Sequence, residues 1–259
     1  MSRRRLDQEL VRRGLVESRT AAQHALDEGR VAVRGVAAPK AATLVRVDDP
    51  LRVLPPPDQY VSRGGAKLAA AIAAFGVPVE GRRALDVGAS TGGFTDCLLQ
   101  LGAAEVTTLD VGYGQLHWRL RSDPRVRVVD RTNARHADPA GIGAPFDLVA
   151  VDVSFISLTL LADQLAAFGS EATDYLLLVK PQFEVGKDAV GKGGVVVDPD
   201  LHRAAIEKVL SGLSKVGLGA RQVVASPIPG AKGNREFFLG VRHGLSTVEE
   251  AALAEVVGA

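Results

Sequence analysis

The segment ALDVGASTGGFTD, residues 84–96, combines a short apolar run, an acid and closely spaced glycines. A turn of this kind after a strand lets the backbone approach a ligand closely. It is not a phosphate-binding P-loop, because Phe94 rather than lysine follows Gly93. The Gly-x-Gly-x-x-Gly pattern of dinucleotide-binding proteins is matched only in part, since Ser90 occupies the second glycine position. These residues indicate a nucleotide-like ligand and leave its class open.

The same segment also fits the pattern acid, x, Gly, x, small, x, Gly, with Asp86, Gly88, Ser90 and Gly92. This pattern resembles motif I of S-adenosylmethionine-dependent methyltransferases. Asp110 ends the next apolar run, where an acid can accept hydrogen bonds from ribose hydroxyls. Nicotinamide enzymes use an acid there too, so the segment favours a methyltransferase without excluding a dehydrogenase.

Four ionisable residues stand at the ends of predicted elements: Lys67, Asp152, Lys180 and Glu236. Asp152 and Lys180 each end a predicted strand, at the carboxyl edge where α/β sheets bind ligands. Each residue alone has an ordinary explanation, because lysine at a strand end is usually solvated and aspartate often caps a turn. Four of them around one cleft predict a catalytic centre.

The elements that position these residues follow from the hydrophobic pattern. From residue 81 onward, strands are expected near 83–88, 105–110, 126–130, 147–152 and 175–180, and helices near 92–101, 115–121, 158–168 and 200–216. QVVASPIPG and REFFLGV predict a closing antiparallel hairpin. The alternation predicts an α/β fold, with a mostly parallel, Rossmann-like sheet and helices on both faces.

The first 54 residues have a different character. A helix is expected from Leu6 to a stop at Gly14, and a second one from Ser18 to Glu28 that ends at Gly29, before three short strands. Residues 1–54 hold 11 Lys/Arg against 7 Asp/Glu (net +4), and the remainder holds 20 against 23 (net −3). A basic module on a mildly acidic body predicts a polyanionic partner. Local ion pairs are expected for one or two of its arginines.

Two family resemblances follow. Residues 4–53 resemble the small α+β S4-type RNA-binding domain through Arg5-Leu6-Asp7, Leu10, Gly14, Ser18-Arg19, Ala22, Gly29-Arg30-Val31, Val33 and Gly35. The four ionisable residues resemble the Lys-Asp-Lys-Glu tetrad of FtsJ-like ribose 2′-O-methyltransferases. Nearly the whole chain resembles the TlyA family, through SRGGAKL, DVGASTGGFTD, LDVGYGQL, RTNAR, DVSFISL, VKPQFEVGK, GGVV and GNREFF.

The TlyA resemblance implies methyl transfer from S-adenosylmethionine to the ribose 2′-hydroxyl of a cytidine in ribosomal RNA, within 30S or 50S subunits or both. A ribose hydroxyl is a poor nucleophile until a base takes its proton. Lys180 is the predicted base and Lys67 the neighbouring cation, with Asp152 and Glu236 orienting the lysines. S-adenosylmethionine is expected to contact Asp86, Gly88, Ala89, Ser90, Gly92, Gly93, Phe94, Asp110 and Asn133. Ser90 has the alternative role of a helix cap.

RNA contacts are expected from Arg5, Arg19, Arg30, Lys40 and Phe155, the last by stacking on a base. His117, Trp118, His136 and Cys97 show no metal-ligand spacing, so no metal site and no chemistry is assigned to them. The predicted domains are an S4-like domain at 1–54, a linker at 55–62 and an FtsJ-like domain at 63–259. Mycobacterial-type family members carry an Arg-x-Trp-Val linker, whereas this chain has Asp58-Gln59-Tyr60-Val61, which puts any role of that arginine in doubt.

Composition limits the remaining classes of protein. The single cysteine excludes an intrachain disulfide and suits a reducing compartment, and no signal peptide or membrane-spanning run is visible. A cytoplasmic protein without stable membrane association is therefore expected. Two alternatives are an RNA-binding protein with an inactive methyltransferase fold and a membrane-lytic haemolysin, although neither an apolar hairpin nor a long basic amphipathic helix supports lysis.

Overall fold

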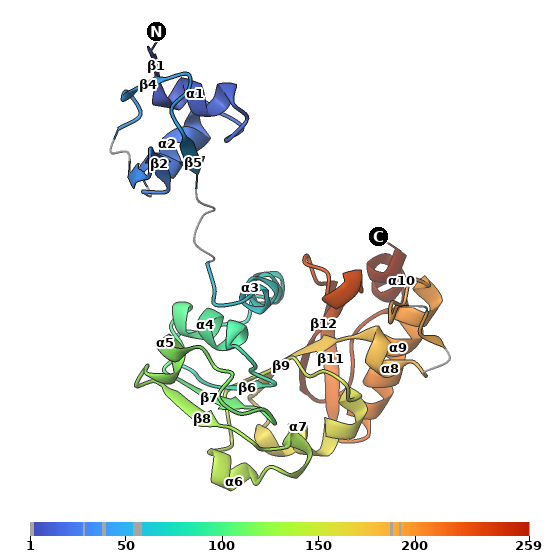
Figure 1. Cartoon of the computed structure of the whole chain (residues 1–259). Helices are drawn as coiled ribbons and strands as arrows, with labels where there is room; N and C mark the ends of the chain where they lie inside the picture. The colour runs from blue at the N-terminus through green and yellow to red at the C-terminus, as the bar shows by residue number, and fades with distance from the viewer. Residues whose placement is uncertain are drawn as a thin grey trace. The chain divides into compact units, whose positions relative to one another are not determined.

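The computed structural model describes residues 3–27, 29–37, 40–53, 59–186, 189–191 and 193–258, and gives only the backbone of Ala37 and Ala231. The chain divides into two compact units, residues 1–58 and 59–259 (Figure 1). Of the predicted linker, residues 55–58 lie outside the described ranges and residues 59–62 belong to the larger unit. The domain boundaries at 54 and 62 stay predictions.

The N-terminal unit has two helices beside short antiparallel strands, in accordance with the predicted α+β module. Gly14 and Gly29 follow the helices at φ 67° and 68°, a left-handed conformation that glycine adopts readily. Ser18 Oγ accepts a hydrogen bond from Ala21 N (3.1 Å) at the start of the second helix. The strands pair as β1–β4 and as β3–β2–β5. The elements are β1 (Arg3–Arg5), α1 (Leu6–Arg12), α2 (Arg19–Asp27), β2 (Val31–Val33), β3 (Val36–Ala37), β4 (Leu44–Arg46) and β5 (Leu51–Val53).

Seven strands form one sheet in the larger unit, in the order β11-β12-β10-β9-β6-β7-β8. β6 to β10 run parallel, and β12 is antiparallel to both β10 and β11. The predicted parallel sheet with a closing hairpin is thus confirmed. The strands are β6 (Arg83–Val87), β7 (Glu105–Leu109), β8 (Val126–Val129), β9 (Leu148–Val151), β10 (Asp174–Val179), β11 (Leu218–Ala225) and β12 (Phe237–His243).

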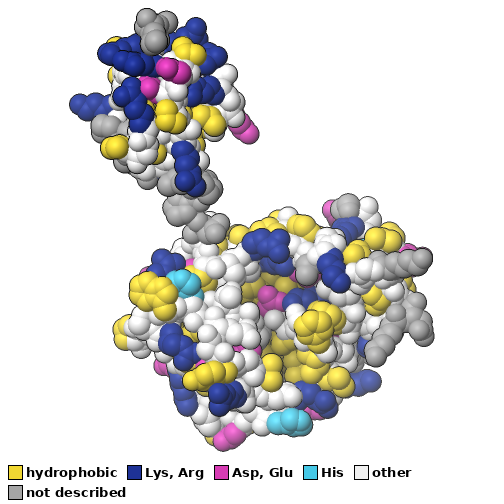
Figure 2. Space-filling model, in the orientation of Figure 1, with side chains coloured by type: hydrophobic (Ala, Val, Ile, Leu, Met, Phe, Trp, Pro, Cys, Tyr) yellow, Lys and Arg dark blue, Asp and Glu magenta, His cyan; other side chains and the backbone are white. Residues whose placement is uncertain are grey.

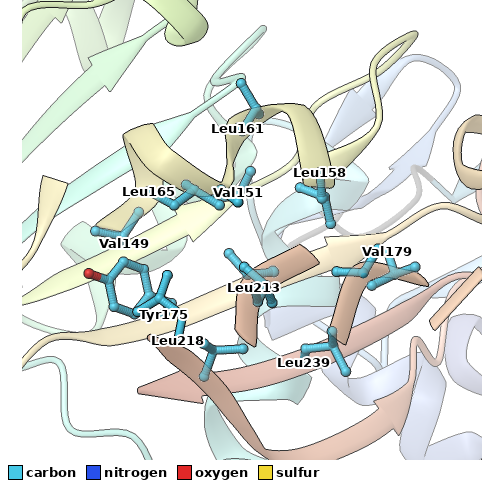
Figure 3. Close-up of a cluster of buried hydrophobic side chains, with 14 of the residues drawn as sticks. Val149, Val151, Leu158, Leu161, Leu165, Tyr175, Val179, Leu213, Leu218 and Leu239 are labelled. Atoms are coloured by element: carbon cyan, nitrogen blue, oxygen red, sulfur yellow. The ribbon is translucent and has the colours of Figure 1, made fainter. Parts of the chain in front are cut away.

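Helices cover both faces of this sheet, because side chains of its strands alternate between two apolar cores. One face carries α3 (Arg63–Phe75), α4 (Gly93–Gln100) and α5 (Trp118–Arg121). The other carries α7 (Ala162–Phe168), α9 (Pro199–Ser214) and α10 (Glu250–Gly258). Figure 3 shows this second core, where Leu165 and Leu213 lie among the strand residues Val149, Val151 and Leu239.

Short helical turns complete the larger unit: η1 (Ala134–His136), α6 (Pro139–Ile142), η2 (Leu158–Leu161), α8 (Pro181–Glu184) and η4 (Ala231–Gly233). The helix predicted at 115–121 is shorter than expected. His117 Nδ1 accepts a hydrogen bond from Arg119 N and caps α5, so the residues before His117 are not helical. The sequence does not predict α3 or α10. No helix in the described part of the chain is long and apolar enough to cross a membrane.

The functional edge of the sheet is formed by the carboxyl ends of β6, β7, β9 and β10. The residues that follow these strands are Gly88, Asp110, Asp152 and Lys180. β6 lies between β7 and β9, so the chain order reverses there. Parallel sheets bind ligands at such a reversal.

Candidate active site

An ion pair joins Lys67 to Glu236, far apart in the sequence. Lys67 Nζ donates to Glu236 Oε2 at 2.6 Å, and both residues are buried. Lys67 lies on α3, and Glu236 directly precedes β12. A buried charge needs a partner of opposite charge, and Lys67 and Glu236 are each other's partners.

A second ion pair joins the ends of two neighbouring strands. Lys180 Nζ lies 2.5 Å from Asp152 Oδ1, and it donates a hydrogen bond to Ser154 Oγ at 2.9 Å. The side chains of Lys180 and Asp152 are only 12% and 24% exposed. Ser154 is not predicted from the sequence. The only feature of the sequence that could have indicated Ser154 is its position two residues after Asp152.

One cavity of about 280 Å³ connects these pairs to the glycine-rich turn. Lys67, Asp152, Ser154 and Lys180 line it, and Glu236 reaches it through its bond to Lys67. Asp86, Gly88, Ala89, Ser90, Gly93 and Phe94 line the same cavity. The four residues predicted as catalytic therefore gather in one place. Within the described ranges there is no group of three or more His, Cys, Asp or Glu that could hold a metal ion.

Asp86 presents an unpaired oxygen in a wholly buried carboxyl group. Its Oδ2 accepts hydrogen bonds from Thr95 N (2.9 Å) and Thr95 Oγ1 (2.6 Å), whereas Oδ1 is buried and has no partner. Burial raises the pKa of Asp86 to about 7, and the nearby charge of Asp152 contributes in the same direction. A buried carboxylate at the wall of a cavity, with one free oxygen, suits a cationic ligand group.

The backbone of the turn fits closely against its surroundings. Gly88 has φ 84°, and a Cβ there would lie 2.5 Å from Asp152 O. Ser90 has φ 48°, uncommon for a residue with a side chain, and its N donates to Asp110 Oδ2 at 2.7 Å. Ser90 does not cap α4, because Gly92 is the N-cap. Gly92 does not line the cavity either: a Cβ there would meet Leu120.

A larger cavity of about 1230 Å³ adjoins the first and shares Gly88, Ser90, Asp152 and Ser154 with it. Asp110, Asn133 and Phe155 line it. Asp110 accepts from Gly112 N as well as from Ser90 N, and Asn133 Oδ1 accepts from Arg135 N, so both side chains are held in place. Figure 2 shows a hollow on this face, with hydrophobic side chains across it and charged ones at its rim.

Phe155 stands at the mouth of the larger cavity in a strained conformation. Its φ is 65°, a genuine outlier for a bulky residue, and it is 91% exposed. Its ring lies 5.1 Å from that of Phe183, a residue that no sequence motif marks as part of the site. A core phenylalanine would be buried and would not need this backbone conformation. The exposure and the strain of Phe155 therefore indicate a contact with a ligand.

The described residues of the linker tetrapeptide are fixed to the larger unit. Tyr60 is buried against Gly65, where a Cβ would lie 2.2 Å from the Tyr60 ring. Val61 N donates to Asp96 Oδ2 (2.8 Å). The residues that follow, Ser62 to Gly64, line the smaller cavity. Tyr60 therefore takes a packing role that needs no arginine, and Asp58 lies outside the described residues.

In the N-terminal unit, more arginines form local ion pairs than the one or two expected. Arg5 and Arg19 both pair with Asp7 (3.1 Å each), and Arg12 and Arg13 both pair with Glu9 (2.5 and 2.8 Å). The expectation is wrong because each buried carboxylate takes two guanidinium groups. Each trio still carries a net positive charge, and the Arg5 and Arg19 side chains remain 43% and 62% exposed. Lys40 is exposed and Arg30 is half-buried.

Comparisons with known proteins agree with this geometry. The profile of FtsJ-like methyltransferases matches residues 60–243, and that of the S4 domain matches residues 4–51. The 16S/23S rRNA (cytidine-2′-O)-methyltransferase TlyA of Mycobacterium tuberculosis is 50% identical over 244 residues, covering 93% of this chain and 91% of the relative. The chain belongs to the TlyA family.

Solved structures place this TlyA-family chain in the same fold. A hemolysin-type protein from Streptococcus thermophilus matches with a TM-score of 0.75 and 35% identity, covering 100% of this chain and 95% of that one. An S-adenosylmethionine-dependent methyltransferase from Mesorhizobium loti matches with a TM-score of 0.51 and 15% identity, covering 70% and 99%. The second likeness shows the fold of the larger unit alone.

Proposed function

We propose that this chain transfers a methyl group from S-adenosylmethionine to the 2′-hydroxyl of a cytidine in ribosomal RNA, within 30S or 50S subunits or both. The observation that carries this proposal is the pairing of Lys180 with Asp152 and of Lys67 with Glu236 around one cavity beside the glycine-rich turn. The 50% identity with a 16S/23S rRNA methyltransferase supports the choice of substrate. Such a substrate would place the protein in the cytoplasm.

The residues of both cavities fit S-adenosylmethionine. The unpaired Asp86 Oδ1 suits the ammonium of its methionine part, and the backbone of Gly88, Ala89 and Gly93 leaves room beside it. Asp110 in the larger cavity would hold the ribose hydroxyls, and Asn133 the adenine edge. Bound there, the cofactor supplies an electrophilic methyl group on a sulfonium.

Lys180 is the base in this mechanism. Its Nζ, when neutral, would take the proton of the ribose 2′-hydroxyl as the oxygen attacks the methyl carbon, and the bond between that carbon and the sulfonium sulfur would break to leave a neutral thioether. Asp152 and Ser154 fix the position of the amine, which otherwise rotates freely at the end of four methylenes. Lys67, held by Glu236, donates a hydrogen bond to the hydroxyl oxygen and orients it.

Phe155 and the N-terminal unit serve the RNA. The ring of Phe155 would stack on the target base once it leaves its helix. Arg5, Arg19, Arg30 and Lys40 would contact phosphates, because structured RNA is read mainly through its shape and backbone. Asp7 keeps Arg5 and Arg19 in fixed directions while their outer N–H groups stay accessible.

Affinity for the cofactor should depend on pH through Asp86. A positively charged ammonium binds the ionised carboxylate, whose pKa in the free protein is about 7. We expect the affinity for S-adenosylmethionine to fall by up to about tenfold for each pH unit below about 7. Isothermal titration calorimetry from about pH 5.5 to about pH 8 measures this, with Asp86→Asn as the control that binds weakly at every pH. A flat profile in the unsubstituted protein would contradict the role of Asp86.

The raised pKa also affects the ligand-free protein. In the unfolded chain Asp86 has its ordinary pKa of 3.8, whereas in the folded protein its pKa is about 7. Between about pH 4 and about pH 7 the carboxyl group is therefore ionised in the unfolded chain but protonated in the folded protein. The contribution of Asp86 therefore lowers the free energy of unfolding as pH rises through this interval. Asp86→Asn should remove that slope, which denaturant unfolding at several pH values detects.

The proposed function is tested with purified 30S and 50S subunits from a strain lacking the gene. Incubation with S-adenosylmethionine carrying a labelled methyl group should label at least one subunit, and mapping should place the label on the ribose of a cytidine. Subunits that bind without being labelled, while the protein binds its cofactor, would favour an RNA-binding protein with an inactive methyltransferase fold. Label on a base would refute the ribose assignment.

A further inference from the structure

The loop between β7 and α5, together with the first residue of α5, presents large apolar side chains to solvent. Val111, Tyr113 and Trp118 are 72%, 66% and 72% exposed. A single exposed apolar residue is ordinary, but three within residues 111–118 form a surface of the kind that a partner covers. The catalytic and cofactor-binding roles proposed above do not use Tyr113 or Trp118.

Cations accompany these rings. The Arg131 guanidinium lies 4.0 Å from the centre of the Tyr113 ring, and Arg119 is exposed beside Trp118. The neighbouring carboxylates are already paired, Asp130 with Arg121 (2.6 Å) and Asp123 with Arg125 (2.8 Å). Within the part of the chain that the structure describes, neither Arg119 nor Arg131 lies within 4.0 Å of a carboxylate. The surface therefore has an excess of positive charge.

Backbone hydrogen bonds hold this loop next to both cavities. His117 N donates to Thr91 O (3.1 Å), and Arg131 N donates to Gly112 O (2.9 Å). Thr91 lines the smaller cavity, and Val111 lines the larger one. Over the position of α5 in Figure 1, Figure 2 shows exposed hydrophobic side chains beside a histidine and several Lys or Arg side chains.

We propose that Tyr113, Trp118, Arg119 and Arg131 form a stacking surface for single-stranded segments of the substrate RNA. Bases stack on the two aromatic rings, and the two arginines contact the adjoining phosphates. This combination of exposed rings and neighbouring cations is how proteins hold unpaired RNA, because every base offers a flat face and every nucleotide a charge. The proposal rests on the proposed function, and it assigns part of substrate binding to the catalytic unit itself.

Trp118 reports on this surface directly, since it is the only tryptophan in the chain. Titration of the full-length protein with a short single-stranded oligoribonucleotide at low salt should quench tryptophan fluorescence, with the same midpoint as binding measured by fluorescence anisotropy of a labelled copy. Binding without a change in tryptophan fluorescence would overturn the proposal, as would no binding at all. A fluorescence change that follows protein concentration without RNA would point to a second copy of the chain and also overturn it.

Variants separate the surface from the catalytic centre. Trp118→Ala should weaken binding of the oligoribonucleotide and raise the KM for ribosomal subunits by about 5- to 100-fold, the usual effect of losing one stacked base. The Kd for S-adenosylmethionine and the kcat should stay unchanged, and Trp118→Phe should restore most of the affinity. Leu245→Ala is the matched control. Leu245 is 86% exposed and follows β12. The last residues of β12 pair with the first residues of β10, so Leu245 lies near the amino end of β10, whereas the site lies at the carboxyl end of that strand.

The outcomes keep the two proposals distinct. If subunits are methylated and Trp118→Ala leaves the KM unchanged, the stacking surface is refuted while the proposed function stands. If neither subunit is methylated, the proposed function fails, and the fluorescence titration with the oligoribonucleotide still decides whether the surface binds RNA.

Discussion

Lys180→Ala is expected to lower the kcat of methyl transfer by about 10²- to 10⁴-fold, the range lost when a general base is removed. Without the amine of Lys180, no neutral nitrogen at this position can take the proton of the ribose hydroxyl. Water can fill the space that this side chain leaves in the polar cavity, but water is a far weaker base than a neutral amine. Single-turnover kinetics with saturating cofactor and ribosomal subunits measure the effect, and binding of both ligands should change little.

Lys180→Arg separates a base from a mere cation. A guanidinium keeps the positive charge but is not deprotonated in proteins. The arginine variant should therefore be about as inactive as the alanine variant, and substantial activity in it would show that Lys180 acts through its charge. Lys215→Ala, which removes an exposed lysine at the end of α9, serves as the control for the loss of one positive charge.

The sequence predicts the position of this centre because strands end at residues of recognisable type. Asp152 and Lys180 directly follow β9 and β10, and parallel neighbouring strands bring their carboxyl ends together. Lys67 and Glu236 are harder to place from pattern alone. Lys67 lies on α3, whose first turn contains Gly64 and Gly65, residues that weaken a helix signal. Its pairing with Glu236 depends on tertiary structure rather than on spacing.

Other features depend on packing that no local pattern encodes. The positive φ of Phe155 and its 91% exposure follow from how the loop leaves β9, whereas composition alone favours a buried phenylalanine. The two pairs of arginines around Asp7 and Glu9 form because both carboxylates are buried. The sequence does not predict this burial, because aspartate and glutamate are usually exposed. Trp118 is assigned no chemistry from the sequence because it shows no metal-ligand spacing, and its 72% exposure becomes visible only in the structure.

Gly88→Ala should lower kcat/KM by about 100-fold or more, although it adds a single methyl group. The new Cβ would lie 2.5 Å from the carbonyl oxygen of Asp152, a distance that real Cβ atoms do not tolerate. The contact is to backbone, so no side chain can rotate away. Either the glycine-rich turn or the residue that pairs with Lys180 must move, and displacements near 1 Å cost about 10²-fold in rate. The Kd for S-adenosylmethionine should rise as well.

Gly81→Ala distinguishes this effect from simple destabilisation. Gly81 also has a left-handed backbone, at φ 73°, but a Cβ there meets nothing within 4 Å. Both substitutions should lower the free energy of unfolding by about 1 kcal/mol through backbone strain, and Gly88→Ala should lower it further because its Cβ also clashes with Asp152 O. Only Gly88→Ala should then lose methyl transfer and cofactor affinity, measured beside thermal unfolding of each variant. Equal losses of activity would mean that stability, not the fit between the turn and Asp152, limits the enzyme.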